Sequence, residues 1–332
     1  MRLKLNNIGI IEKAEINFDG LTVIAGKNDS GKSTIGKLLY SLIKTIKWAS
    51  NTDGLENRYA SKFDKFITSL FKNQISKRGK ISFEYNDFSF DIDIKNNHCI
   101  DFNYPLNYVN KEIKTTSPLL IETPYIWSIL PSLKTIRNLE SHGNEIDFEL
   151  SETLKDLHFA LTIKLKESDD KVKLDIKPII NGNFQENSLG DFVFQKENEN
   201  IELINTAMGI KYFGIFQVLS DKNHFYNGQV LILDEPEVHL HPTWQLKLAE
   251  LIVILVQKGI KILVNSHSPY MIEALEKYAK IAKIKSDFYL AEDTKIEKIE
   301  NSNSRTLSAI FEKLSEPYDI FENMESDRFK NG

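Results

Sequence analysis

The run Gly26 to Ser33 has the residue types and spacing of a phosphate-binding loop. It reads Gly-Lys-Asn-Asp-Ser-Gly-Lys-Ser and fits the pattern G-x-x-x-x-G-K-[ST]. Glycines let consecutive backbone N–H groups face phosphate oxygens, and the start of a following helix adds partial positive charge. The predicted contacts are Gly26, Asn28, Ser30, Gly31, Lys32, Ser33 and Thr34, with Lys32 neutralising the β/γ-phosphate region and Ser33 offering a hydroxyl to Mg²⁺.

Two carboxylates, Asp234 and Glu235, follow the apolar run 229–233. A carboxylate at a strand end beside a phosphate loop can hold Mg²⁺, usually through the water of the ion. The next side chain points elsewhere because side chains alternate, so it can orient and deprotonate an attacking water. A solvated strand end is the alternative interpretation. The phosphate loop favours Asp234 as a metal ligand and Glu235 as a catalytic base.

Strands and helices that can position these residues alternate at both ends of the chain. An apolar strand at 21–25 enters the loop, and an amphipathic helix over 32–43 leaves it. After the strand at 229–233 comes a helix over 242–258, with Pro at its first turn and Gly just past its end, and then a strand at 261–264. This alternation predicts an α/β fold in which distant segments share a parallel sheet.

The middle of the chain has a different pattern. Residues 80–102 alternate as hairpin strands, 119–126 indicate another strand, 128–140 and 152–166 indicate helices, and 171–204 indicate further hairpins. Sustained heptads are absent, which argues against a long coiled-coil arm.

The segment 45–80 is basic, and a helix within it places Phe63 and its apolar neighbours on one side, with Lys62, Lys65 and Lys72 elsewhere. A core-packing helix with solvated lysines is the first interpretation. Contact with DNA through residues 58–80 is the second.

Bulk composition limits the partners. The chain has 332 residues, a net charge of −5 and a single cysteine, Cys99, so a general electrostatic attraction to nucleic acid and an internal disulfide are not expected. No signal core and no apolar run long enough for a membrane span is visible. These features predict a cytoplasmic protein without a membrane partner.

The segment Leu233 to Pro242, which reads Leu-Asp-Glu-Pro-Glu-Val-His-Leu-His-Pro, resembles the Walker B and D-loop region of ABC-type ATPases related to the OLD and SMC families. The opening Leu5-Asn6-Asn7-Ile8-Gly9 and the phosphate loop also resemble their heads. The resemblance implies a P-loop ABC-ATPase head with a mixed sheet, an antiparallel β-subdomain and a helical/β insertion. It implies ATP and Mg²⁺ as cofactors, hydrolysis of ATP, and a switch histidine, His267, at the γ-phosphate.

In this resemblance Asn205 to Lys211 occupies the place of the signature motif, which binds the γ-phosphate held by the opposite subunit. Met208 and Gly209 are then nucleotide-binding residues of a homodimer or higher oligomer. Relatives commonly carry Ser where this chain has Met208, and Met cannot donate the hydroxyl hydrogen bond. No Gln lies between Gln74 and Gln185, so Glu122 to Tyr125 only stands near the place of a Q-loop.

His239 and His241, with Asp234 and Glu237 nearby, could alternatively ligate a transition metal. The resemblance favours another interpretation. In ABC heads the segment that corresponds to Leu233 to Pro242 extends to the partner subunit, and these two histidines would fix its conformation there.

The predicted organisation is an ATPase head over 1–45 and 200–305, an antiparallel β-subdomain with a helical insertion over 46–199, and a C-terminal helix with an acidic tail over 306–332. Too few residues follow His267 for a nuclease domain like that of OLD proteins. The chain therefore resembles stand-alone ATPase subunits of bacterial anti-phage defence systems such as PARIS and Septu, which control a separately encoded effector, a nuclease or toxin. The alternatives are an SMC-like ATPase that clamps DNA during repair and a nucleotide-binding subunit of a transporter.

Overall fold

The computed structural model describes residues 1–50, 58–103, 116–141, 150–167, 170–188 and 190–299. The predicted C-terminal helix and tail at 306–332 lie outside these residues.

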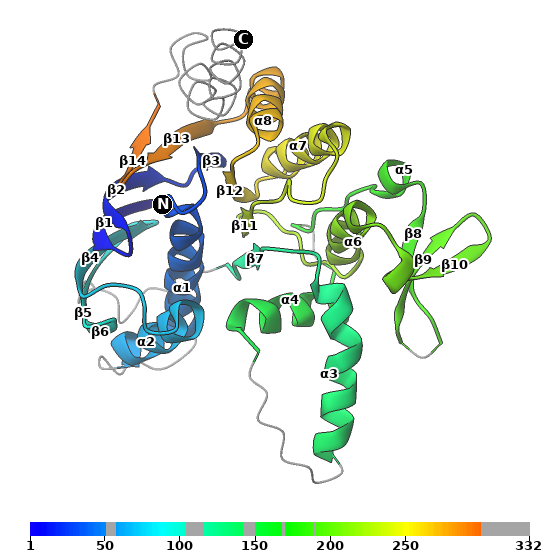
Figure 1. Cartoon of the computed structure of the whole chain (residues 1–332), viewed down its shortest axis with the longest axis horizontal. Helices are drawn as coiled ribbons and strands as arrows, with labels where there is room; N and C mark the ends of the chain where they lie inside the picture. The colour runs from blue at the N-terminus through cyan, green and yellow to red at the C-terminus, as the bar shows by residue number, and fades with distance from the viewer. Residues whose placement is uncertain (51–57, 104–115, 142–149, 168–169, 189, 300–332) are drawn as a thin grey trace, which may run out of the picture.

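One mixed sheet organises the described part of the chain (Figure 1). Its eleven strands have the order β6-β5-β4-β1-β2-β14-β13-β3-β12-β11-β7. Their bounds are β1 (Arg2–Ile8), β2 (Ile11–Asn17), β3 (Leu21–Gly26), β4 (Arg78–Tyr85), β5 (Phe88–Lys95), β6 (His98–Asn103), β7 (Leu119–Ile121), β11 (Val230–Asp234), β12 (Lys261–Ser266), β13 (Ser286–Glu292) and β14 (Lys295–Lys298). The run β7-β11-β12-β3-β13 is parallel, and the run β6-β5-β4-β1-β2 is antiparallel.

Helices cover both faces of this sheet. They are α1 (Lys32–Ser50), α2 (Arg58–Phe71), α3 (Ile126–Ser141), α4 (Glu152–Thr162), α5 (Lys177–Ile180), α6 (Met208–Asp221), α7 (Pro242–Gln257) and α8 (Pro269–Ala282), with a short 3-10 turn at Leu203–Asn205. A separate three-stranded sheet contains β8 (Asn183–Glu186), β9 (Phe192–Lys196) and β10 (Glu199–Glu202). In the described residues no helix combines the length and apolarity that a membrane span requires.

The central parallel strands β3, β11 and β12 are mostly apolar because both of their faces are buried. In β11, Leu231 and Leu233 pack with α6, α7 and α8, whereas Ile232 packs with α1 on the other face. Figure 1 shows α1 below the sheet and α7 and α8 above it. The predicted α/β fold of the P-loop class, with a mixed sheet, is therefore confirmed.

Three predictions about the middle of the chain are wrong in part. The strand predicted over 119–126 ends at Ile121, and Pro124 with Tyr125 forms the turn that leads into α3. The helix predicted over 152–166 ends at Thr162, because Ile163 is extended. The segment 171–204 contains the short helix α5, with Pro178 in its first turn, as well as strands.

Strands β4 to β6 continue the same sheet as β1 and β2. The division of the chain at residues 45 and 200 stays a prediction.

Candidate nucleotide site

Apart from Met208 and Gly209, the candidate residues lie where the parallel strands of the sheet end. The phosphate loop follows β3, Asp234 ends β11, His267 follows β12, and Glu122 follows β7. The carboxyl ends of parallel strands are the usual ligand site of α/β sheets. The non-local pairing of β7, β11, β12 and β3 therefore brings together residues far apart in sequence.

The glycines of the phosphate loop are required by its geometry. Gly31 has a φ of +85°, and a Cβ there would lie 2.7 Å from the Ile11 side chain. A Cβ at Gly26 would lie 2.4 Å from the carbonyl oxygen of Ala291. A residue with a side chain could occupy either position only if the neighbouring atoms moved.

Lys32 points its ammonium into the phosphate loop. The side chain is buried, and Nζ donates to the carbonyl oxygens of Gly26 at 2.8 Å and Lys27 at 2.6 Å. Burial lowers the Lys32 pKa, while the charges of Glu235 and Asp234 oppose this shift. A phosphate would add negative charge beside a cation that the loop already holds in place.

The remaining loop residues have different environments. Ser30 is buried and donates from Oγ to the Lys27 carbonyl at 2.8 Å, whereas Asn28 is exposed and Thr34 is half-buried. A cavity of about 230 Å³ lies between the loop and the end of β13, lined by Gly26, Lys27, Asn28, Asp29, Ser30, Leu290, Ala291, Glu292 and Asp293.

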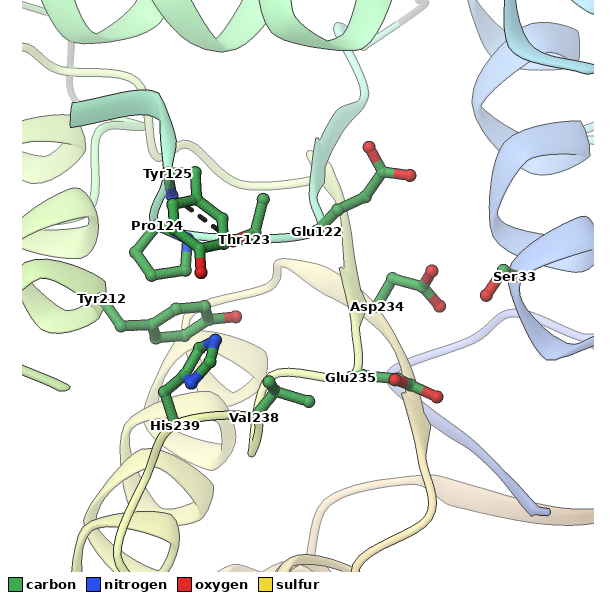
Figure 2. Close-up of a pocket in the computed structure, with 10 residues that line it drawn as sticks. All are labelled: Ser33, Glu122, Thr123, Pro124, Tyr125, Tyr212, Asp234, Glu235, Val238 and His239. Atoms are coloured by element: carbon green, nitrogen blue, oxygen red, sulfur yellow. Dashed lines mark hydrogen bonds between the residues drawn. The ribbon is translucent and has the colours of Figure 1, made fainter. Parts of the chain in front are cut away.

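Ser33, Asp234 and Glu235 line a second cavity of about 330 Å³, shown in Figure 2. Its other lining residues are Glu122, Thr123, Pro124, Tyr125, Tyr212, Val238 and His239. In Figure 2 the carboxyl group of Asp234 extends toward the Ser33 hydroxyl. One hydroxyl and one carboxylate are the protein ligands that Mg²⁺ needs when phosphates and waters supply the rest, so these residues fit the ion.

The buried side chain of Asn265 fixes this geometry. Its Nδ2 donates to Asp234 Oδ1 at 2.7 Å and to the Lys32 carbonyl oxygen at 3.0 Å. Asn265 lies two residues before the predicted switch histidine, and its bridging role depends on the pairing of β12 with β11 and β3.

Glu235 is held in an uncommon backbone conformation. Its φ is +49°, and its N–H donates to the Asn265 carbonyl at 2.9 Å. Oε1 of Glu235 lies 3.4 Å from His267 Nδ1. The turn thus places the side chain of the predicted base beside the predicted switch histidine. Uncommon backbone conformations of this kind are frequent at functional sites.

Glu122, which stands near the expected place of a Q-loop, lines the cavity that contains Ser33, Asp234 and Glu235. Oε1 lies 3.7 Å from Lys37 Nζ, and burial raises the Glu122 pKa, with Lys37 acting against the rise and Asp234 adding to it. The sequence signal was only its position after an apolar run, since the residue is not Gln.

Met208 and Gly209 stand apart from Lys32. They begin α6, whose N-cap residue Ala207 makes no side-chain hydrogen bond, and neither residue lines either cavity described above. Within one described chain the predicted signature residues therefore do not join the phosphate loop.

His239 and His241 structure the turn that follows Glu235. His239 has a φ of +70° and packs edge-on against Tyr125, with ring centroids 6.1 Å apart. His241 caps α7 by accepting the Thr243 N–H at 3.4 Å. Among the described residues, no group of three or more His, Cys, Asp or Glu side chains is arranged to hold a metal. The transition-metal alternative has no support in this region.

The basic helix α2 packs its apolar side inward. Phe63 and Ile67 are buried, and Lys62 Nζ lies 4.9 Å from the centroid of the Phe66 ring. Lys65 and Lys72 are exposed. This arrangement supports the interpretation of α2 as a core-packing helix, with Lys62 packed over an aromatic ring.

Residues 110–272 match the family model of an AAA ATPase domain, a span just under half of the chain that includes Asp234, Glu235 and His267 but not the phosphate loop. No curated protein matches the chain.

Three solved structures are similar at low identity. An SMC head bound to the C-terminal winged-helix domain of ScpA has 14% identity and a TM-score of 0.49, covering 92% of this chain and 98% of that one. The SMC head domain from Thermotoga maritima has 16% identity and a TM-score of 0.45, covering 90% and 98%. An ATP-binding cassette of an ABC transporter, in its ADP conformation, has 14% identity and a TM-score of 0.40, covering 98% and 99%.

Overall likenesses at these TM-scores do not by themselves establish a shared function. The phosphate loop, the strand-end carboxylates and the match to the family model together indicate an ATP-binding ATPase domain of the P-loop class.

Proposed function

We propose that this protein is an ABC-type ATPase that hydrolyses ATP between two copies of the chain and acts as a switch. The observation that carries the proposal is the cavity shared by Ser33, Asp234 and Glu235 at the strand edge beside Lys32. These residues supply a metal-binding pair, a base and a phosphate-binding cation.

The mechanism follows from where these side chains lie. Lys32 and the loop N–H groups bind the β- and γ-phosphates. Ser33 and Asp234 would hold Mg²⁺, which would neutralise charge on the phosphates. Glu235 takes a proton from the water that attacks the γ-phosphate. His267, 3.4 Å from Glu235 Oε1, contacts the γ-phosphate from the neighbouring strand end.

A second copy completes the site in this proposal. Helix α6 begins at Met208 without a side-chain cap, so N–H groups of its first turn can bind an anion. Since Met208 and Gly209 line neither of the two cavities described above, the phosphate that they bind in this proposal is the one held by the partner copy.

Replacing Glu235 tests hydrolysis. Glu235→Gln should retain ATP binding and lose turnover, because the amide cannot accept the proton of the water. Glu250→Gln, an exposed position on α7, is the matched control and should hydrolyse ATP like the native protein. Equal phosphate release from both variants would exclude the assigned role of Glu235.

We further propose that the switch controls a separately encoded effector of an anti-phage defence system. The resemblance of the phosphate loop and the Leu233 to Pro242 segment to ABC-type ATPases related to the OLD and SMC families supports an ATP-driven switch of this kind. Co-expression with the products of adjacent genes should recover an ATP-dependent complex and protect cells from phage, and Lys32→Ala should abolish both. A chain that recovers no such partner and gives no protection would exclude the defence role.

The alternative, an SMC-like ATPase that clamps DNA, has its support in the exposed Lys65 and Lys72 near α2. It predicts duplex binding that weakens with salt and with Lys65→Glu and Lys72→Glu. Lys62 is less informative because its ammonium packs over Phe66. Salt-independent or undetectable duplex binding would exclude this alternative.

A further inference from the structure

Glu237 is a buried carboxylate that the proposed hydrolysis does not use. Its side chain is 3% exposed, although the residue lies only two positions after the proposed base. One oxygen, Oε1, accepts hydrogen bonds from Ser266 Oγ at 2.7 Å, from the His267 N–H at 2.8 Å and from the Ser268 N–H at 3.1 Å. Burying a carboxylate is costly unless donors surround it. All three donors to Oε1 come from the segment that carries His267, whereas Oε2 is buried without a hydrogen-bond partner.

The imidazole of His267 lies between two carboxylates. Its Nδ1 is 3.3 Å from Glu237 Oε1 and 3.4 Å from Glu235 Oε1. Neither contact has hydrogen-bond geometry, and Nδ1 is buried without another partner. A rotation of the ring would align Nδ1 with Oε1 of Glu235 or with Oε1 of Glu237. The hydrogen bond that Nδ1 makes then fixes the direction of Nε2.

A second set of bonds ties the same segment to the turn after Glu237. Ser268 Oγ donates to Gln245 Oε1 at 2.6 Å, and Gln245 Nε2 donates to the Leu240 carbonyl at 3.0 Å. All of these side chains are buried. The position of His267 is thus coupled to the turn 235–241 through Glu237 at one end and Gln245 at the other.

We propose that Glu237 is a positioning residue for His267: it holds the backbone of residues 266–268 and accepts a hydrogen bond from the Nδ1–H of the imidazole. This bond leaves the Glu235 carboxylate free for water and directs Nε2 to the γ-phosphate. The inference rests on the proposed function, because it assigns Glu237 a part in that hydrolysis. A purely structural anchor would stabilise the fold without acting through His267.

A double-mutant cycle separates these two roles. Glu237→Gln keeps the shape of the side chain and removes its charge. Because the imidazole of His267 would then be slightly misplaced, kcat should fall roughly 10- to 100-fold. KM should stay within about 3-fold of the native value. In a His267→Ala background the same change should alter kcat by less than about 2-fold, since the two residues act as one unit. An equal loss in both backgrounds would overturn the proposal.

Nitrogen NMR of the imidazole provides a readout that does not depend on turnover. The chain has 7 histidines, and the signals of His267 are identified by their loss in His267→Ala. Glu237→Gln should shift the Nδ1 signal of His267, and Ser266→Ala, which removes one donor from Glu237 Oε1 and is less disruptive, should shift it in part. An unchanged Nδ1 signal in both variants would contradict the inference.

The two proposals fail differently. Absence of ATP hydrolysis by the native chain would exclude the proposed function, whereas a shifted Nδ1 signal would still establish the contact of Glu237 with His267. Normal hydrolysis together with an unchanged Nδ1 signal would exclude the role of Glu237 alone.

Discussion

The side chains of Asn265 and Asp234 are joined by a hydrogen bond of 2.7 Å, in which Nδ2 donates to Oδ1. The same amide donates to the backbone carbonyl of Lys32, so one fully buried side chain connects the first turn of α1 to the proposed metal ligand. A carboxylate held in this way keeps one orientation toward Ser33.

Removal of this bond should weaken metal-dependent nucleotide binding. Asn265→Ala frees the Asp234 carboxylate and should lower Mg²⁺–ATP affinity about 10-fold, the lower end of outer-shell effects. Asn265→Asp should lower the affinity further, because it replaces the donor with a second negative charge. Isothermal titration of the three proteins measures this order, and equal affinities would show that Asn265 does not set the geometry of Asp234.

A negative charge at the start of α6 should stabilise the monomer and weaken the ATP-dependent dimer. Ala207 is exposed and provides no side-chain cap, so Ala207→Asp should stabilise the monomer by about 1 kcal/mol. The same carboxylate should repel the phosphate of the partner copy and reduce dimerisation driven by ATP.

Ala207→Ser serves as the control, because it adds a cap without a charge. Thermal unfolding and sedimentation with ATP measure the two effects. If Ala207→Asp dimerised as well as Ala207→Ser, the start of α6 would not be the anion site.

The buried His224 should make stability depend on pH. Its Nε2 lies 2.7 Å from the Ile163 carbonyl oxygen, and burial lowers its pKa from the ordinary 6.5, with Lys171 and Lys222 contributing and the Ile163 bond opposing. The unfolded chain therefore binds more protons than the folded chain just below pH 6.5. This contribution to stability is present above that pH and decreases as the pH falls through it.

Urea unfolding at several pH values, from about pH 8 down to about pH 5, measures this contribution around the ordinary histidine pKa. His224→Gln should reduce the loss of stability on acidification. An identical pH dependence in the native and variant proteins would assign that loss to other groups.

The local parts of the site could be predicted from the sequence. The phosphate loop is encoded by consecutive residues between a strand and a helix, and the spacing alone predicts the roles proposed for Lys32 and Ser33. Asp234 and Glu235 follow an apolar strand in the same way. The alternation of apolar strands and helices also predicted that distant segments share a parallel sheet, as observed for β3, β12 and β11.

The non-local parts could not be predicted. Glu122 reaches the cavity because β7 pairs with β11, and a three-residue strand gives no signal for that pairing. The partners of Asn265 and Glu237 could not be predicted either. Asn265 binds Asp234, 31 positions away, and Glu237 binds Ser266, 29 positions away. Such contacts depend on strand order and on side-chain orientation rather than on any local pattern.

The oligomeric state of Glu235→Gln in the presence of ATP tests the central claim most directly. Sedimentation across a range of protein concentrations should show monomers without nucleotide and dimers with Mg²⁺–ATP, and ATP should bind more tightly as the dimer forms. A monomer that binds ATP with the same affinity at every protein concentration would contradict a site shared between two copies.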